Sequence, residues 1–139
     1  MNGTNATETS GAVSGGVRIL LRLEGLALLG CATLLYAVFG GSWWTYAILF
    51  LAPDLSFAGY LAGPKAGAIV YNAAHSYLGP LALMAAAMSM AAPALPFLAM
   101  IWLAHIGFDR ALGYGLKYPA GFGFTHLGRI GKDAKTTAS

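Results

Sequence analysis

The sequence has little charge and almost no cysteine. Only 9% of its 139 residues are charged, whereas about a quarter is usual in soluble domains, so an ordinary soluble globular domain is excluded. The single cysteine, Cys31, allows no internal disulfide, and its place inside an apolar segment favours a packed thiol over a reactive one. Acidic residues number five, and those within apolar segments are costly in lipid and usually mark function.

In place of charge the chain has long apolar segments. Hydrophobic residues make up 58% of it and the mean hydropathy is +0.65, so the bilayer is the solvent that we expect. Topology and anionic lipid explain the net charge of +3. No basic motif interleaved with aromatic residues indicates nucleic acid. The expected partners are therefore membrane lipids, without nucleic acid.

Four apolar segments predict an all-α, four-helix transmembrane bundle. The helices are expected at residues 17–39, 43–60, 65–90 and 93–114, each about long enough to span the hydrocarbon core. Glycine or proline separates them, and the Gly79-Pro80 pair predicts a kink in the third helix. Residues 1–16 are predicted as a disordered tail, residues 17–118 as the membrane domain, and residues 119–139 as an aromatic and basic C-terminal segment and tail.

The basic residues predict the orientation. Arg18 and Arg22 flank the first helix, Lys65 lies in the turn between the second and third, and further Lys and Arg residues follow the fourth. The other two turns have no Lys or Arg. Because cytoplasmic flanks are enriched in these residues, both termini are predicted to be cytoplasmic. We expect a multi-pass protein of the bacterial inner (cytoplasmic) membrane, acting as a homo-oligomer or in a larger membrane complex.

Polar side chains of the four helices fall in one layer of the cytoplasmic half. At 1.5 Å per residue they lie about 8 to 10 Å, or one further turn, from the cytoplasmic helix ends. They are Glu24, Asp54, Asn72, His75, His105 and Asp109. His105 lies four residues before Asp109, and Tyr71 lies four before His75, so each pair shares one helix face.

The polar layer predicts a metal site. Imidazole nitrogen and carboxylate oxygen are ligands of zinc and related divalent ions. The expected metal ligands are Asp54, His75, His105 and Asp109. Such an ion lowers the pKa of a water molecule, and Glu24, Asp54 or Asp109 would act as the catalytic carboxylate. This favours a metal-dependent hydrolase that acts on a lipid or amphiphile. Glu24 and Asn72 are expected around the ligands. Substrate-binding side chains are expected at Tyr71, Asn72, Arg110, Tyr114 and His126.

Other readings of the same residues remain open. His75 and His105 share a depth and would also serve as axial ligands of a haem. Intramembrane His and Asn residues also form interhelical hydrogen bonds, and Asp54 with Arg110 would form a structural ion pair. The protein would then be a non-enzymatic accessory subunit, or a small-molecule-binding or proton-binding bundle with a structural polar layer. The chain lacks the HExxH motif, paired Glu-x-x-His motifs and a cysteine cluster.

The segment after the fourth helix is too aromatic for a simple linker. Tyr118, Phe122 and Phe124 lie within seven residues of one another. We expect residues 114–129 to fold back over the cytoplasmic mouth of the bundle. Anchoring of these aromatic residues in the interface is the alternative.

Several strings across residues 18–131 resemble those of a known family. They are LRLEGLALL, GGSWW, APDLSFAGYLAGP, YNAAHSY, WLAHIGFDRALGYGLKYP and THLGRIG. The chain resembles the small bacterial integral-membrane family catalogued as domain of unknown function 4260. The resemblance implies a four-helix membrane protein and carries no established activity. More loosely, the Pro53-Asp54 pair and the later His and Asp residues are similar to inner-membrane metal-dependent hydrolases of the YdjM type. The chain is shorter and lacks the Asp-x-Asp-His string expected after that pair.

Overall fold

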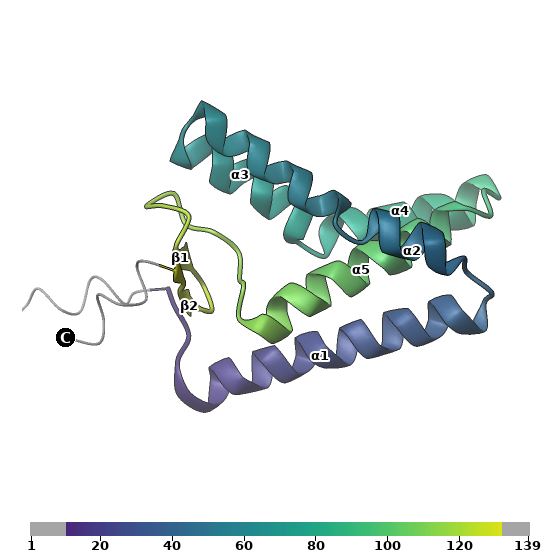
Figure 1. Cartoon of the computed structure of the whole chain (residues 1–139), viewed down its shortest axis with the longest axis horizontal. Coiled ribbons are helices and arrows are strands. Elements are labelled where there is room, and N and C mark those ends of the chain that lie inside the picture. The colour runs from purple at the N-terminus through teal and green to yellow at the C-terminus, as the bar shows by residue number, and fades with distance from the viewer. Residues whose placement is uncertain (1–10, 132–139) are drawn as a thin grey trace, which may run out of the picture.

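The structure is a computed structural model, and it describes residues 11–131 of the chain. These residues are mostly helical, with a short hairpin of two antiparallel strands near the C-terminus (Figure 1). The elements are α1 (Gly15–Val38), α2 (Trp43–Leu49), the 3-10 helix η1 (Ala52–Ala62), α3 (Pro64–His75), α4 (Leu78–Met90), α5 (Leu95–Leu112), β1 (Phe124–Thr125) and β2 (Gly128–Arg129). Most of the tail predicted for residues 1–16 lies outside the described residues, and α1 already begins at Gly15.

Three stretches of the described chain are long and apolar enough to cross a membrane. They are Gly15–Val38, Trp43–Ala62 and Leu95–Leu112, and α4 is a shorter apolar helix. Large apolar side chains remain exposed on these helices, among them Leu34 and Leu61. Exposed apolar surface of this extent requires lipid or another apolar partner to cover it. The prediction of a mostly helical protein with helices that could span a membrane is confirmed, whereas the four-helix bundle and the orientation of its termini stay predictions.

Helix α1 lies along α5 (Figure 1). Two glycines bring the backbones of these helices together. A Cβ atom added to Gly107 would lie 2.6 Å from the carbonyl oxygen of Gly25 and 2.7 Å from the amide nitrogen of Leu29. A Cβ atom on Gly25 would lie 2.9 Å from the carbonyl oxygen of Gly107. All three distances are shorter than real side chains accept, so this close helix pair needs glycine at both positions.

The second and third apolar segments are each interrupted. Helix α2 gives way to η1, whose first turn carries Pro53 and Asp54. Helix α3 ends at His75, Ser76 is extended, and α4 begins at Leu78. The predicted kink at Gly79-Pro80 is thus a complete break that lies four residues earlier. A proline ring clashes with the carbonyl four residues before it, which here belongs to Ser76, so a continuous helix cannot form through this point.

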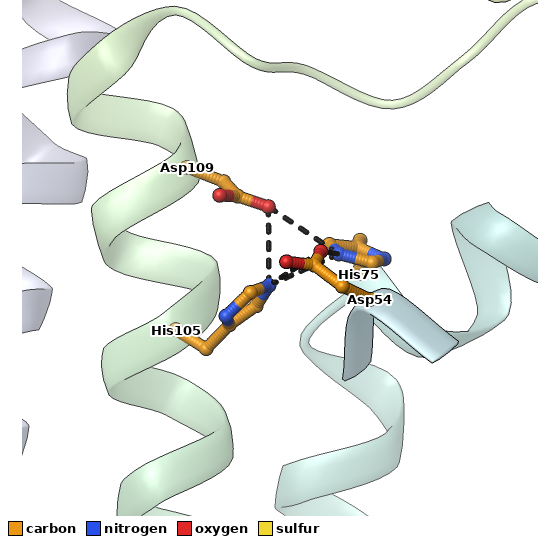
Figure 2. A group of neighbouring side chains, drawn as sticks. All are labelled: Asp54, His75, His105 and Asp109. Carbon is orange, nitrogen blue, oxygen red and sulfur yellow. Dashed lines mark hydrogen bonds and ion pairs between the residues drawn. The ribbon is translucent and has the colours of Figure 1, made fainter. Parts of the chain in front are cut away.

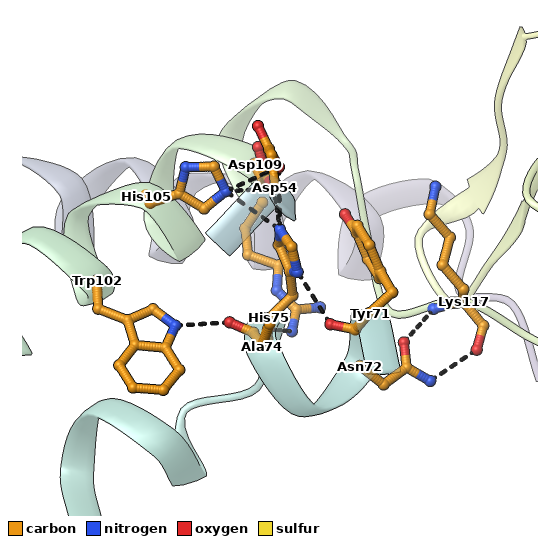
Figure 3. A network of polar contacts seen from close by, with 10 residues as sticks. Asp54, Tyr71, Asn72, Ala74, His75, Trp102, His105, Asp109 and Lys117 are labelled. Atoms are coloured by element: carbon orange, nitrogen blue, oxygen red, sulfur yellow. Dashed lines mark hydrogen bonds and ion pairs between the residues drawn. The ribbon is translucent and has the colours of Figure 1, made fainter. Parts of the chain in front are cut away.

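Side chains from α5 satisfy the backbone at this break. The last carbonyls of a helix lack intrahelical donors and need other partners, above all within a membrane. The indole N–H of Trp102 donates to the carbonyl oxygen of Ala74 at 2.6 Å (Figure 3). Arg110 Nη2 donates to the carbonyl oxygen of His75 at 3.2 Å. The end of α3 is therefore fixed against α5 at the position of His75.

Candidate metal centre

Four side chains from three elements converge at the two helix interruptions. Asp54 comes from the first turn of η1 and His75 from the last residue of α3. His105 and Asp109 come from successive turns of α5 (Figure 2). The histidine side chains are 4% and 1% exposed, that of Asp109 is 13% exposed and that of Asp54 is 32% exposed. The structure thus brings together the four residues predicted as metal ligands.

The distances between the facing atoms match those between ligands of one small ion. His75 Nε2 lies 3.3 Å from both Asp54 Oδ1 and Asp109 Oδ2. His105 Nε2 lies 3.3 and 3.2 Å from the same two oxygens, and the two Nε2 atoms are 3.1 Å apart. Tetrahedral zinc with ligands at about 2.0 to 2.1 Å has neighbouring ligand atoms about 3.3 Å apart. The group is therefore close enough to hold a divalent metal ion.

The other ring nitrogen of His75 fixes which of its tautomers is present. His75 Nδ1 lies 2.9 Å from the carbonyl oxygen of Tyr71. A carbonyl only accepts, so Nδ1 carries the hydrogen and the neutral ring presents a lone pair at Nε2. This lone pair faces two carboxylate oxygens and a second imidazole, an arrangement that needs a cation or a proton among them. Metal-bound histidines are usually oriented by such a bond from the opposite ring nitrogen.

Aromatic rings hold both imidazoles in place. The ring of Tyr71 stacks on that of His75 with centroids 3.8 Å apart and planes 9° apart. The ring of Phe50 meets that of His105 edge-on, with centroids 5.4 Å apart. Tyr71, predicted to bind substrate, therefore orients His75 through both its ring and its carbonyl, and its ring also lines the cavity beside the cluster.

A cavity of about 290 Å³ adjoins the carboxylates of the cluster. Its lining residues are Asp54, Phe57, Tyr71, Phe108, Asp109, Tyr114, Lys117, Phe122 and Ile130. The predicted substrate residue Tyr114 is among them, and so is Lys117, one of the basic residues that follow the fourth predicted helix. Lys117 is 3% exposed, and its Nζ lies 3.8 Å from the ring centroid of Phe122 and 5.0 Å from that of Tyr71. Burial lowers the pKa of Lys117 to about 8, against a smaller opposite effect of Asp109.

The C-terminal segment folds back and forms one wall of this cavity. The amide group of Asn72 makes two bonds to the main chain of Lys117 (Figure 3). Asn72 Oδ1 accepts a hydrogen bond from the N–H of Lys117 at 2.6 Å, and Asn72 Nδ2 donates one to the carbonyl oxygen of Lys117 at 2.8 Å. The expected return of residues 114–129 is therefore observed, and Asn72 holds this segment to α3 instead of bonding the cluster.

The comparison with protein families agrees with the resemblance in the sequence. A model of the family described as domain of unknown function (DUF4260) matches residues 18–130. The chain belongs to the DUF4260 family. Comparisons with curated proteins and with solved structures found no match. The matched residues include the four side chains of the cluster and the returning C-terminal segment. The looser similarity to hydrolases of the YdjM type stays a prediction.

The remaining predicted site residues of this DUF4260 chain line a second cavity. Glu24, Arg110 and His126 border a space of about 360 Å³ beside the break between α3 and α4. Arg110 Nη1 lies 2.9 Å from His126 Nε2, and burial together with the nearby Arg110 charge lowers the pKa of His126. In the described residues Arg110 forms no ion pair with Asp54 or Asp109. Glu24 is exposed and borders this other cavity. Helical rise predicts the depth of Glu24 in the membrane, but not the direction in which its side chain points around the helix axis.

The geometry of the DUF4260 cluster does not fit a haem held by both histidines. Axial ligands stand on opposite faces of the macrocycle. The two Nε2 atoms lie 3.1 Å apart and both face the same pair of aspartates. A macrocycle has no room between them, so a small cation is the better match to this donor set.

Proposed function

We propose that this protein is a divalent-metal-dependent hydrolase of the bacterial inner membrane that acts on a lipid or another amphiphile. Zinc is the ion that the donor set favours, because two imidazoles and two carboxylates suit it in number and kind. The observation that carries the proposal is the 3.1 to 3.3 Å spacing between the Nε2 atoms of His75 and His105, and from each of them to the carboxylates of Asp54 and Asp109. The two carboxylates would neutralise the charge of the ion.

The four ligands have different roles in this proposal. Catalytic zinc sites usually keep three protein ligands and one exchangeable position, and the metal supplies Lewis-acid catalysis there. His75, His105 and Asp109 hold the ion, because they are the most buried of the four. Asp54 is the most exposed of the four and borders the cavity. Its carboxylate would therefore be the exchangeable ligand, and it would accept a proton from water during hydrolysis.

Substrate would reach the site from the membrane. The apolar surface of η1, which carries Asp54, is exposed along much of its length, so lipid would reach an element of the site directly. Both termini lie in the cytoplasm in this proposal, as the basic flanks predict. The proposal leaves room for a homo-oligomer or for a partner complex, and it requires neither for the chemistry.

Hydrolysis by the zinc-loaded protein tests the proposal. The full chain in phosphatidylcholine vesicles would be assayed with p-nitrophenyl decanoate and p-nitrophenyl phosphate as chromogenic probes. We expect cleavage of at least one probe, in proportion to bound zinc, and loss of cleavage in H105Q and D109N. If zinc binds stoichiometrically and neither the probes nor extracted membrane lipid are cleaved, the proposal of hydrolase activity is wrong. The metal would then support a structural or accessory role.

A further inference from the structure

A second, apolar space lies beside residues that are chain neighbours of the ligands. It is a groove of about 400 Å³ lined by Leu49, Ala52, Pro53, Ser56, Ala74, Leu83, Leu98, Ile101 and Trp102. Pro53 and Ala74 directly precede the ligands Asp54 and His75 in the chain. The groove therefore approaches the cluster along the backbone of η1 and α3, while the cavity with Lys117 lies at its carboxylates.

The groove suits hydrocarbon. Its lining residues carry only two polar side-chain groups, the hydroxyl of Ser56 and the indole N–H of Trp102. The indole N–H already donates to the carbonyl oxygen of Ala74. A polar ligand would lose its hydrogen bonds to water in this groove and find few replacements, whereas an alkyl chain gains from burial.

The cavity that Lys117 lines suits an anion. Lys117 is buried, its Nζ faces the rings of Tyr71 and Phe122, and in the part of the chain that the structure describes it has no ion pair. When a divalent ion is held by the carboxylates of Asp54 and Asp109, their charges balance. The ammonium of Lys117 then leaves one positive charge uncompensated in the cavity, and a buried charge of this kind is costly unless it is paired.

We propose that the substrate of this site is a single-chain amphiphile with a phosphate head group. The phosphate lies between the metal and Lys117, and the alkyl chain lies in the apolar groove. Lysine binds phosphate as a point charge, and metal sites of this kind stabilise charge on phosphoryl oxygens. The inference rests on the proposed function for its metal, and it adds the head group, the chain and the residue that selects them.

Binding of matched probes tests this inference. The full chain in phosphatidylcholine nanodiscs would be titrated with dodecyl phosphate, dodecyltrimethylammonium and inorganic phosphate. Dissociation constants would be measured from tryptophan fluorescence, since Trp102 lines the groove. We expect dodecyl phosphate to bind more tightly than inorganic phosphate, because only the former fills the groove. A52W narrows the groove at an exposed alanine. It should weaken the binding of dodecyl phosphate and leave the binding of inorganic phosphate unchanged.

K117M is the decisive variant. Its main-chain bonds to Asn72 remain, and a methionine side chain fits between aromatic rings, so the wall of the cavity is kept. We expect dodecyl phosphate to bind about 10- to 100-fold more weakly to K117M, the loss typical of one charge-assisted hydrogen bond. K65M is the matched control, because Lys65 is exposed at the start of α3 and lies outside the residues that line the cavity.

Two results would overturn the inference, and a separate one would overturn the hydrolase. Equal binding of dodecyl phosphate to K117M and wild type, or equal binding of inorganic and dodecyl phosphate to wild type, would contradict the inference. Metal content measured on the same samples tests the proposed function. If no metal is bound, that function fails. The effect of K117M on the preference for dodecyl phosphate over dodecyltrimethylammonium, measured on zinc-loaded protein, decides the inference separately from any hydrolysis.

Discussion

The Nε2 atoms of His75 and His105 lie 3.1 Å apart, although the two residues are 30 positions apart in the sequence. Each atom also faces the carboxylates of Asp54 and Asp109. The bond from His75 Nδ1 to the Tyr71 carbonyl leaves the neutral His75 ring with a lone pair at this meeting point. This lone pair beside two carboxylate oxygens and a second imidazole needs a cation or a proton among them.

Metal should therefore stabilise the folded protein. Binding to the native state alone adds about 4 kcal/mol when the free ligand is 1,000 times its dissociation constant. We expect zinc to raise the thermal midpoint of chelator-treated wild type in mild detergent, as followed by circular dichroism. The midpoints of H105Q and D109N should not respond. A zinc response of D109N equal to that of wild type would place the ion elsewhere.

Asn72 should matter for the C-terminal segment and little for the metal. N72A removes both bonds to the main chain of Lys117, a loss of about 1 to 3 kcal/mol in the attachment of this segment. Hydrogen exchange should quicken in residues 114–129, while zinc stoichiometry stays at the wild-type value. S89A is the control, because the Ser89 hydroxyl bonds only to carbonyls of its own helix. Loss of zinc from N72A would restore the earlier prediction that Asn72 supports the ligands.

The contact between α1 and α5 should tolerate no added methyl group. G107A places a Cβ atom 2.6 Å from the carbonyl oxygen of Gly25, and overpacking of this kind costs about 1 to 3 kcal/mol. We expect a lower thermal midpoint for G107A and for G25A. G30A lies in the same helix as Gly25 and meets nothing within 4 Å, so its midpoint should equal or exceed that of wild type. Equal midpoints for G107A and G30A would refute the close packing.

Lys117 should make stability depend on alkaline pH. Its pKa is lowered by burial from 10.5 to about 8. Between these values the unfolded chain keeps the proton that the native chain has lost, so stability rises as pH increases from 8 to 10.5. In chelator-treated protein, the thermal midpoint of wild type relative to K117M should increase over this interval. A constant difference between the two midpoints would show that Lys117 is not desolvated.

The predicted orientation is tested by labelling. In a C31A background, single cysteines replacing Ser42 and Ala92 should react with an impermeant maleimide added outside intact cells. A cysteine replacing Lys65 should react only after the cells are opened. The basic flank at Lys132 lies outside the described residues, so Lys65 is the informative cytoplasmic position. External labelling of the cysteine at position 65 would show that the predicted topology is inverted.

Much of the site could be predicted from the sequence because lipid restricts polar groups. Helical rise set a common depth, and spacing put His105 and Asp109 on one face. Depth does not give the rotation of a helix about its axis. The sequence therefore could not show that Glu24 borders a different cavity from the one beside the ligands. Its position in the second cavity depends on the contact of Gly25 with α5, which only the tertiary structure shows.

The helix interruptions and Lys117 could not be placed in advance. Proline limits a helix, but whether Pro80 produces a kink or a break depends on partners for the freed carbonyls. Trp102 and Arg110 provide them from α5, a segment distant in the sequence. Lys117 looks like an ordinary basic flank until Asn72 fixes the returning segment beside the cavity.

Elemental analysis of the wild-type protein tests the central claim most directly. The full chain would be purified in mild detergent without chelators, and its metals would be quantified per folded chain beside H105A and D109N. The account predicts one divalent ion, most often zinc, in wild type and none in either variant. A correctly folded wild type without stoichiometric metal would contradict the account and leave a hydrogen-bonded structural layer at Asp54, His75, His105 and Asp109.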